Sequence, residues 1–96
     1  MYQLPGVDCD KAERLLEQIR RNPRSQSPDA LRQTAEVLGY QLDRKRGKGS
    51  HVMMRGGGRP FSISTGKDPV TIGVVKSILA VLEEVFDDKC GNRKSG

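Results

Sequence analysis

The stretch GYQLDRKRGKGSHVMMRGGGRPFSIS, residues 39–64, decides the fold that we predict for this chain. Apolar residues recur there at every second position, which is the period of a strand with one buried face. They fall into three short runs: Tyr40 and Leu42, Val52 and Met54, then Phe61 and Ile63. Glycine-bearing turns at 47–49 and 56–58 separate the runs. The stretch therefore predicts a three-stranded antiparallel meander over residues 40–64, with an apolar face that other elements must cover.

Two helices are expected before this sheet, within residues 10–38. Between 11 and 21, apolar residues recur at the three-and-four spacing of an amphipathic helix, after a potential N-cap at Asp8. The Ser-Pro-Asp sequence at 27–29 supplies a cap, a proline suited to the first helical position and an acid in the first turn. A second helix should run from there to about Leu38, where Gly39 favours a left-handed end.

A third helix is expected after the sheet. Residues 71–86 have the most apolar helical pattern of the chain, and we expect them to form the central core piece. This helix is too short and too charged to span a membrane. Residues 89–96 are polar and contain glycine, which predicts a disordered tail. With 96 residues the chain supports one domain, over 1–88. The predicted class is α+β in the order α-α-β-β-β-α, with the helices on one face of the sheet.

Basic residues are concentrated in the middle of the chain. The net charge of +5 favours an anionic partner, which nucleic acid, a membrane surface or an acidic protein would all satisfy. From Arg44 to Lys67 the sequence has seven lysines or arginines and no acid. The positive field is therefore local to the predicted hairpins. The candidate phosphate-binding residues are Arg44, Lys45, Arg46, Lys48, Arg55, Arg59 and Lys67.

His51 is the only histidine, and strand alternation places it on the face of the sheet opposite Val52. That face should be open to solvent, because the helices cover the other one. Residues directly opposite in an antiparallel pair share a face, so two registers of the first hairpin are compatible with the pattern. If Leu42 lies opposite Val52, Asp43 faces His51 and can orient its imidazole. If the register slips by two residues, Lys45 faces His51 instead.

The two cysteines, Cys9 and Cys90, lie near opposite ends of the sequence and show no CxxC spacing. We expect them to be free thiols in a reducing cytoplasm, and the second interpretation is a bridge that joins the two ends. One histidine and two remote cysteines do not supply a zinc site. We therefore expect no metal and no cofactor.

The order helix, Gly39, strand, turn, Gly49-Ser50-His51, two further strands and a closing helix resembles the HicA family of toxin-antitoxin systems. The resemblance covers residues 31–86. It implies a double-stranded-RNA-binding-domain-like α-β-β-β-α fold, mRNA interferase activity, and neutralisation by a HicB-like antitoxin. His51 stands where the resemblance places the catalytic histidine. Family members often carry a proline and a histidine after the third strand, whereas Ser64-Thr65-Gly66-Lys67 follows here.

The function expected from these observations is metal-independent cleavage of RNA by an endoribonuclease in the cytoplasm. A histidine with an ordinary pKa near 6.5 can move protons at neutral pH, which such cleavage requires. We expect His51 to be the catalytic residue and the basic side chains around it to hold phosphates. Two alternatives use the same basic hairpin: an RNA-binding module without catalysis, and a protein-interaction domain that docks an acidic partner.

Overall fold

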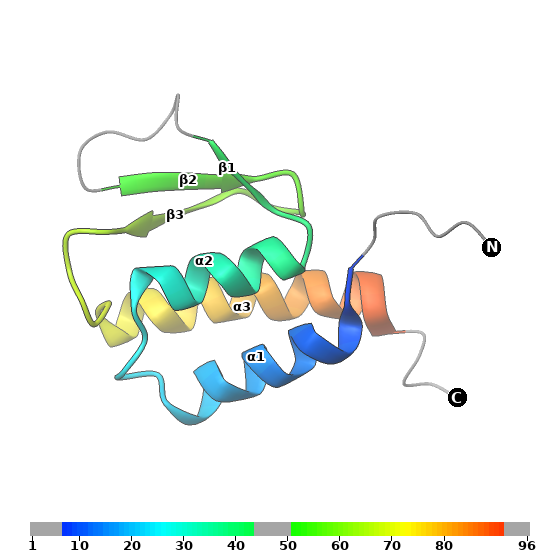
Figure 1. Cartoon of the computed structure of the whole chain (residues 1–96), viewed down its shortest axis with the longest axis horizontal. Helices are drawn as coiled ribbons and strands as arrows, with labels where there is room; N and C mark the ends of the chain where they lie inside the picture. The colour runs from blue at the N-terminus through cyan, green and yellow to red at the C-terminus, as the bar shows by residue number, and fades with distance from the viewer. Residues whose placement is uncertain (1–6, 44–50, 92–96) are drawn as a thin grey trace.

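Three helices and a three-stranded sheet follow one another in the predicted order α-α-β-β-β-α (Figure 1). The structure is a computed structural model, and it describes residues 7–43 and 51–91. The elements are α1 (Cys9–Arg21), α2 (Pro28–Val37), β1 (Gln41–Asp43), β2 (His51–Arg55), β3 (Phe61–Ser64) and α3 (Ile72–Cys90). The α+β class is therefore confirmed, and the part from α2 to α3 has the α-β-β-β-α order of a double-stranded-RNA-binding-domain-like fold.

The signals that predicted the helix ends are satisfied locally. The Asp8 carboxylate accepts a hydrogen bond from the backbone N–H of Lys11 at 3.1 Å, which caps α1. The Ser27 hydroxyl accepts a hydrogen bond from the backbone N–H of Ala30 at 3.1 Å, which caps α2. The helix then begins with a proline, as the sequence predicted. Gly39 has φ of +100°, a left-handed conformation that ends α2 and turns the chain into the sheet.

The sheet has the strand order β1-β2-β3, and both pairings are antiparallel. Leu42 lies opposite Met54, and Met54 lies opposite Phe61, so the predicted apolar residues do share one face. Met54 and Ile63 are fully buried on that face. The helices cover this face of the sheet, since α2 packs on β3 and also on α3.

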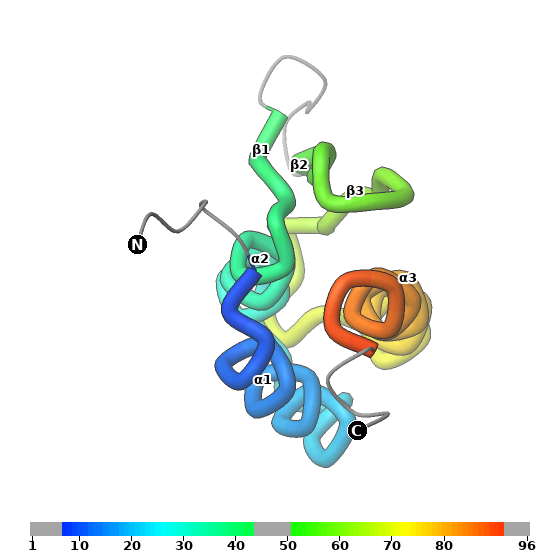
Figure 2. Tube along the Cα trace, turned by 90° about the vertical axis from the view of Figure 1, so that its right-hand side faces the viewer, coloured from blue at the N-terminus to red at the C-terminus, as the bar shows by residue number. Residues whose placement is uncertain are grey.

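The helices all lie on one side of the sheet. Figure 2 shows the sheet above α2 and α3, and α1 below these two helices. The buried apolar face of α1, built on Ala12, Leu16 and Ile19, packs on α3 and α2. The molecule is thus layered as sheet, two helices, then a third helix. Among the residues that the structure describes, no element covers the opposite face of the sheet (Figure 2).

The turn between β2 and β3 packs tightly on Tyr40. The Tyr40 ring meets Phe61 edge-on at 5.0 Å between centroids, and the Tyr40 hydroxyl donates a hydrogen bond to the carbonyl of Arg59 at 2.6 Å. A Cβ atom on Gly57 would lie 2.4 Å from Cδ1 of Tyr40, closer than two atoms can approach. Glycine is therefore required at position 57 by the packing of the aromatic ring.

The end of α3 differs from the sequence prediction. The helix does not stop near Phe86 but continues to Cys90, so Lys89 and Cys90 belong to the fold and not to a disordered tail. The Lys89 ammonium donates a hydrogen bond to the carbonyl of Leu38 at 2.9 Å, where α2 ends. Cys90 is buried, and these contacts hold the last turn of α3 in place.

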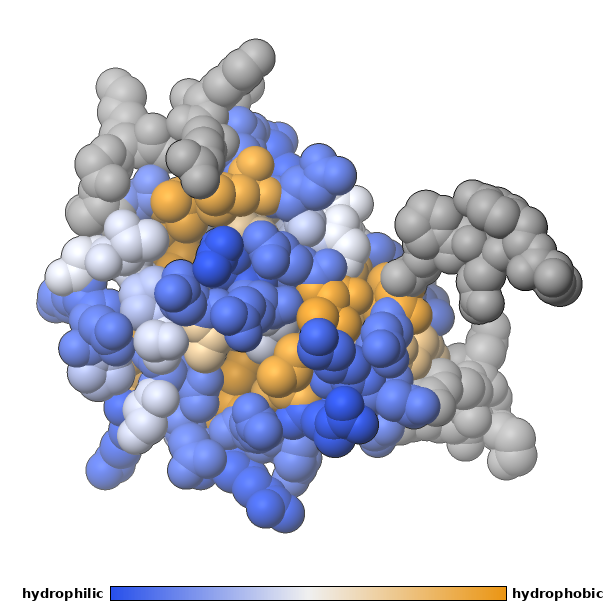
Figure 3. Space-filling model, in the orientation of Figure 1, coloured by the Kyte–Doolittle hydropathy of each residue, from blue (hydrophilic) through white to orange (hydrophobic). Residues whose placement is uncertain are grey.

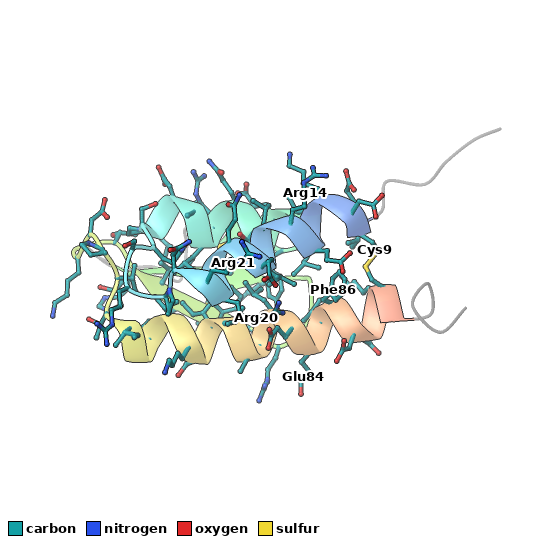
Figure 4. The ribbon with its side chains drawn as sticks, turned by 90° about the horizontal axis from the view of Figure 1, so that it is seen from below. Cys9, Arg14, Arg20, Arg21, Glu84 and Phe86 are labelled. Atoms are coloured by element: carbon teal, nitrogen blue, oxygen red, sulfur yellow. A yellow bond between two sulfur atoms is a disulfide. The ribbon has the colours of Figure 1, made fainter. Side chains whose placement is uncertain are left out.

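The two cysteines form a disulfide, which corrects the expectation of free thiols. Cys9 at the start of α1 is bonded to Cys90 at the end of α3, with 5.9 Å between the Cα atoms (Figure 4). The bridge between the two ends, which was the second interpretation of the sequence, is the one that the structure shows, and it joins residues 81 positions apart. The bridge and the Arg20–Glu83 contact, in which Nε donates to the carboxylate at 2.9 Å, join α1 to α3 at two points.

No helix within the described ranges is both long enough and apolar enough to cross a membrane. On the face of the molecule shown in Figure 3, hydrophobic residues reach the surface in patches between hydrophilic side chains.

Candidate nucleic-acid interface

The open face of the sheet carries the histidine together with polar and charged side chains. Strand β2 contributes His51, Met53 and Arg55 to this face, and their cross-strand partners complete it. These partners are Gln41 and Asp43 on β1 and Ser62 and Ser64 on β3. We call these seven residues the open face. Its chemistry is one imidazole, one guanidinium, one carboxylate, one amide and two hydroxyls around a thioether side chain.

His51 is the first residue of β2 and is exposed, as alternation predicted. Its partner across the β2–β3 ladder is Ser64. Residues directly opposite in an antiparallel pair have Cβ atoms about 4.5–5.5 Å apart, so the hydroxyl and the imidazole share one small area of surface. Within residues 7–43 and 51–91, no side chain is hydrogen-bonded or ion-paired to the imidazole. The ring is therefore accessible to a ligand on this face.

Asp43 does not take the position predicted for it opposite His51. The register places Leu42 opposite Met54 and Asp43 opposite Met53, which is two residues away from the register that the Asp43–His51 pair needs. The Asp43 carboxylate instead forms an ion pair with Nε of Arg55 at 3.1 Å. The observed register is the second of the two that the alternation allowed. Lys45, which that register would bring to His51, lies outside the described residues.

Arg55 lies on the open face at the end of β2 farthest from His51. Its side chain is 45% exposed, so it is available to a ligand even though Asp43 holds it. An ion pair this close to solvent contributes about 0–1 kcal/mol, and a phosphate can compete for the guanidinium. Asp43 and Arg55 thus act as one unit, in which the carboxylate sets the direction of the guanidinium and partly cancels its charge.

Arg59 and Lys67 do not share the open face with Arg55. Arg59 is in the turn between β2 and β3, and its guanidinium contacts Glu84 on α3 at 2.9 Å. That contact points Arg59 toward the helical layer. Lys67 is exposed in the connection between β3 and α3. The structure therefore brings only Arg55, of the described basic candidates, onto the same sheet face as His51.

The remaining candidates, Arg44, Lys45, Arg46 and Lys48, lie in the connection between β1 and β2, outside the described residues. Asp43 and His51 flank this connection in the chain. The connection contains four basic residues and no acid.

Ser64 is part of this site, but the sequence analysis assigned no function to it. Phe61 and Ile63 must share a face with Val52 and Met54. This condition restricts the second hairpin to registers in which a serine lies opposite His51 or Met53. It did not select among these registers. The apolar packing of Met54 opposite Phe61 and Val52 opposite Ile63 decides that Ser64 is the partner of His51.

A metal site is not part of this arrangement. Among the residues that the structure describes, no group of three His, Cys, Asp or Glu side chains is placed to hold an ion. Comparisons with models of known protein families, with curated proteins and with solved structures found no match.

Proposed function

We propose that this protein binds RNA with the open face of its sheet and the adjoining basic connection, and that it cleaves RNA as a toxin-type endoribonuclease similar to the HicA family. The observation that carries the proposal is the exposed His51 at the start of β2, opposite Ser64 and next in the chain to four basic residues. The order of elements from α2 to α3, which matches the order implied by the HicA resemblance, supports it.

The chemistry requires two proton transfers and stabilisation of a phosphate. In RNA cleavage without metal, the 2′-hydroxyl loses its proton as its oxygen attacks the adjacent phosphorus, and the leaving 5′-oxygen gains one. A histidine can carry out either transfer, with an effect of about 10²- to 10⁴-fold on the rate. His51 is the candidate for this role. The second proton carrier is then water or a lysine such as Lys48, because the chain has no second histidine.

The neighbours of His51 have roles that follow from their chemistry. The Ser64 hydroxyl can donate a hydrogen bond to a phosphate oxygen that lies against the imidazole. Arg55 can bind a neighbouring phosphate, since guanidinium groups match phosphate geometry with two parallel hydrogen bonds. Between them, Met53 offers an apolar surface for the face of a base.

A single experiment tests catalysis and binding separately. The purified protein is incubated with a single-stranded RNA in EDTA, in parallel with His51→Ala and with Gln33→Ala, an exposed control on α2. Cleavage by the wild type and Gln33→Ala, with loss of at least about 10²-fold in His51→Ala, is the expected result. Equal cleavage by His51→Ala removes His51 from the mechanism.

An RNA-binding module without catalysis is the second candidate function. The observation in its favour is that no side chain among the described residues orients the His51 imidazole, which catalytic histidines usually require. Retention of RNA on the wild type at low salt, with no cleavage under any condition, would decide for this alternative. Weaker retention at higher salt would identify phosphate contacts as its basis.

The proposed role includes a HicB-like antitoxin as partner and the cytoplasm as place of action. Cytoplasmic action requires that the fold tolerate loss of the Cys9–Cys90 bond, since disulfides are rarely maintained there. Purification of the protein from cells that co-express a small acidic protein encoded next to it tests the partner. Suppression of toxicity by that protein, together with a stable complex, is the expected result.

A further inference from the structure

Helix α1 lies outside the α-β-β-β-α part of the fold and is attached to that part at both of its ends. Figures 1 and 2 show it as the outermost layer, on the side of α2 and α3 away from the sheet. At its first residue, Cys9 is bonded to Cys90 at the end of α3. At its other end, residues 22–27 connect it to the start of α2. One of these two tethers is therefore a bond that a reductant can break.

The connection between α1 and α2 is anchored at Gln26, which is buried. The Gln26 carbonyl accepts a hydrogen bond from the backbone N–H of Val70 at 2.8 Å, just before α3 begins. Its side-chain amide donates a hydrogen bond to the carbonyl of Asn22 at 2.9 Å, directly after α1 ends. The contact with Val70 fixes the chain at Gln26 without involving α1. The second tether therefore remains in place when α1 moves.

Between the two tethers, α1 rests on a narrow apolar face. Three of its 13 residues are buried, namely Ala12, Leu16 and Ile19. The Arg20–Glu83 ion pair joins α1 to α3, but its side chains are 50% and 38% exposed, and ion pairs so open to solvent contribute little to stability. A helix of this length is marginal in water on its own. The docking of α1 is therefore sensitive to how its ends are held.

From this arrangement we infer that the Cys9–Cys90 bond is a redox switch for α1, whose reduction lets α1 leave the helical layer while the part from α2 to α3 stays folded. With the bond intact, an undocked α1 is still a loop closed between Cys90 and Gln26. Opening a loop of about this length favours the undocked state by about a hundredfold. Undocking uncovers Leu16 and Phe86, which line the α1–α3 contact. The inference is independent of whether the open face cleaves RNA.

The chemical step is thiol–disulfide exchange with a dithiol. Cys9 is half-buried whereas Cys90 is 1% exposed, so Sγ of Cys9 is the sulfur that a thiolate of the reductant can reach. Its attack breaks the S–S bond, and Cys90 leaves as a thiolate that takes up a proton. The second thiol of the reductant then displaces Cys9. Both cysteines end as thiols, and the dithiol is oxidised to its own disulfide.

Native-state hydrogen exchange of the full-length, ¹⁵N-labelled protein tests the inference. Exchange is followed by NMR over a series of low urea concentrations, with the oxidised protein and with the protein reduced by dithiothreitol. On reduction, the Leu16 and Ile19 amides should exchange about tenfold to a hundredfold faster, and their rates should then depend little on urea, as in local opening. The Ile78 and Leu82 amides of α3 should keep the steep urea dependence of global unfolding.

Ile63→Val is the control that separates local from global opening in the reduced protein. It removes buried atoms from the sheet and should accelerate exchange of Leu82, while the rate for Leu16 stays that of the reduced wild type. Equal acceleration of Leu16 and Leu82 in this variant would overturn the inference, because α1 would then open only with the whole chain. So would a common rate and urea dependence for both amides in the reduced wild type, or a Leu16 rate unchanged by reduction.

Discussion

Ser64 lies directly opposite His51 in the β2–β3 ladder, on the open face of the sheet. This pairing connects the proposed chemistry to a position that can be changed without touching the core. We expect Ser64→Glu to weaken RNA retention about tenfold at low salt, because a carboxylate next to His51 repels phosphate. Filter binding against salt concentration measures the effect. Gln33→Glu on α2 adds the same charge away from the sheet and should change retention little; equal loss in both variants would contradict the placement of the RNA.

Asp43 holds Arg55 and reduces the positive charge of the open face. Asp43→Asn should therefore strengthen RNA binding by about two- to fivefold at low salt, since the guanidinium is released toward phosphate. Asp88→Asn on α3 makes the same change in net charge and serves as control. Anisotropy titrations of the two variants at equal salt make the comparison. Weaker binding by Asp43→Asn would mean that the carboxylate orients Arg55 for RNA instead of competing with it.

The Cys9–Cys90 bond should contribute strongly to stability. It closes a loop between residues 81 positions apart, and closing such a loop in the unfolded chain is worth about 4 kcal/mol. Urea unfolding of the wild type with and without a thiol reductant should show this loss in the free energy of unfolding. The double variant Cys9→Ser with Cys90→Ser should unfold like the reduced wild type and respond to reductant no further. Coincident curves for oxidised and reduced protein would show that the bond adds nothing.

Gly57 and Gly73 provide a matched pair of glycines with opposite surroundings. A Cβ at 57 would meet Tyr40 at 2.4 Å, whereas a Cβ at 73 would meet nothing within 4 Å. Gly57→Ala should lower the free energy of unfolding by about 2 kcal/mol through overpacking. Gly73→Ala, in the first turn of α3, should leave it unchanged or raise it by up to about 0.5 kcal/mol. Thermal unfolding measures the change in stability of both variants. Similar changes would show that the Tyr40 ring moves aside at little cost.

Tyr40 should make stability sensitive to alkaline pH. Burial raises the pKa of its hydroxyl above the ordinary value of 10.0, so the folded state keeps this proton to higher pH than the unfolded chain does. Below pH 10 the group adds no pH dependence; as pH rises past 10, the unfolded chain ionises first and stability falls.

Tyr40→Phe isolates this effect. At neutral pH the variant should be about 1 kcal/mol less stable than the wild type, because the hydrogen bond to the Arg59 carbonyl is lost. Above pH 10 the difference should shrink, since only the wild type has the group that titrates. Urea midpoints of both proteins over a pH series measure it. A difference that stays constant with pH would contradict the raised pKa of Tyr40.

Local patterns were sufficient to predict the order of the helices and strands, although not the end of α3. The cap at Asp8, the Ser-Pro-Asp start at 27–29 and the left-handed Gly39 act within a few residues, and each lies where the sequence placed it. Alternation of period two assigned Met54 and Ile63 to the buried face and His51 to the open one. These assignments depend only on backbone geometry, which neighbouring residues determine.

Tertiary structure alone decided which residues meet. Period two fixes the face of a strand but leaves its register open, so the separation of Asp43 from the position opposite His51 followed from the packing of Leu42 opposite Met54. Arg59 turned from the open face because Glu84, 25 residues later, lies beside the turn. Cys9 is bonded to Cys90, and Lys89 donates a hydrogen bond at the end of α2, because α3 extends along both other helices. Contacts over such separations depend on how the elements stack, and no local pattern encodes them. Local sequence patterns thus specify a helical layer under a sheet with an exposed histidine, and the packing of the elements specifies the neighbours of that histidine.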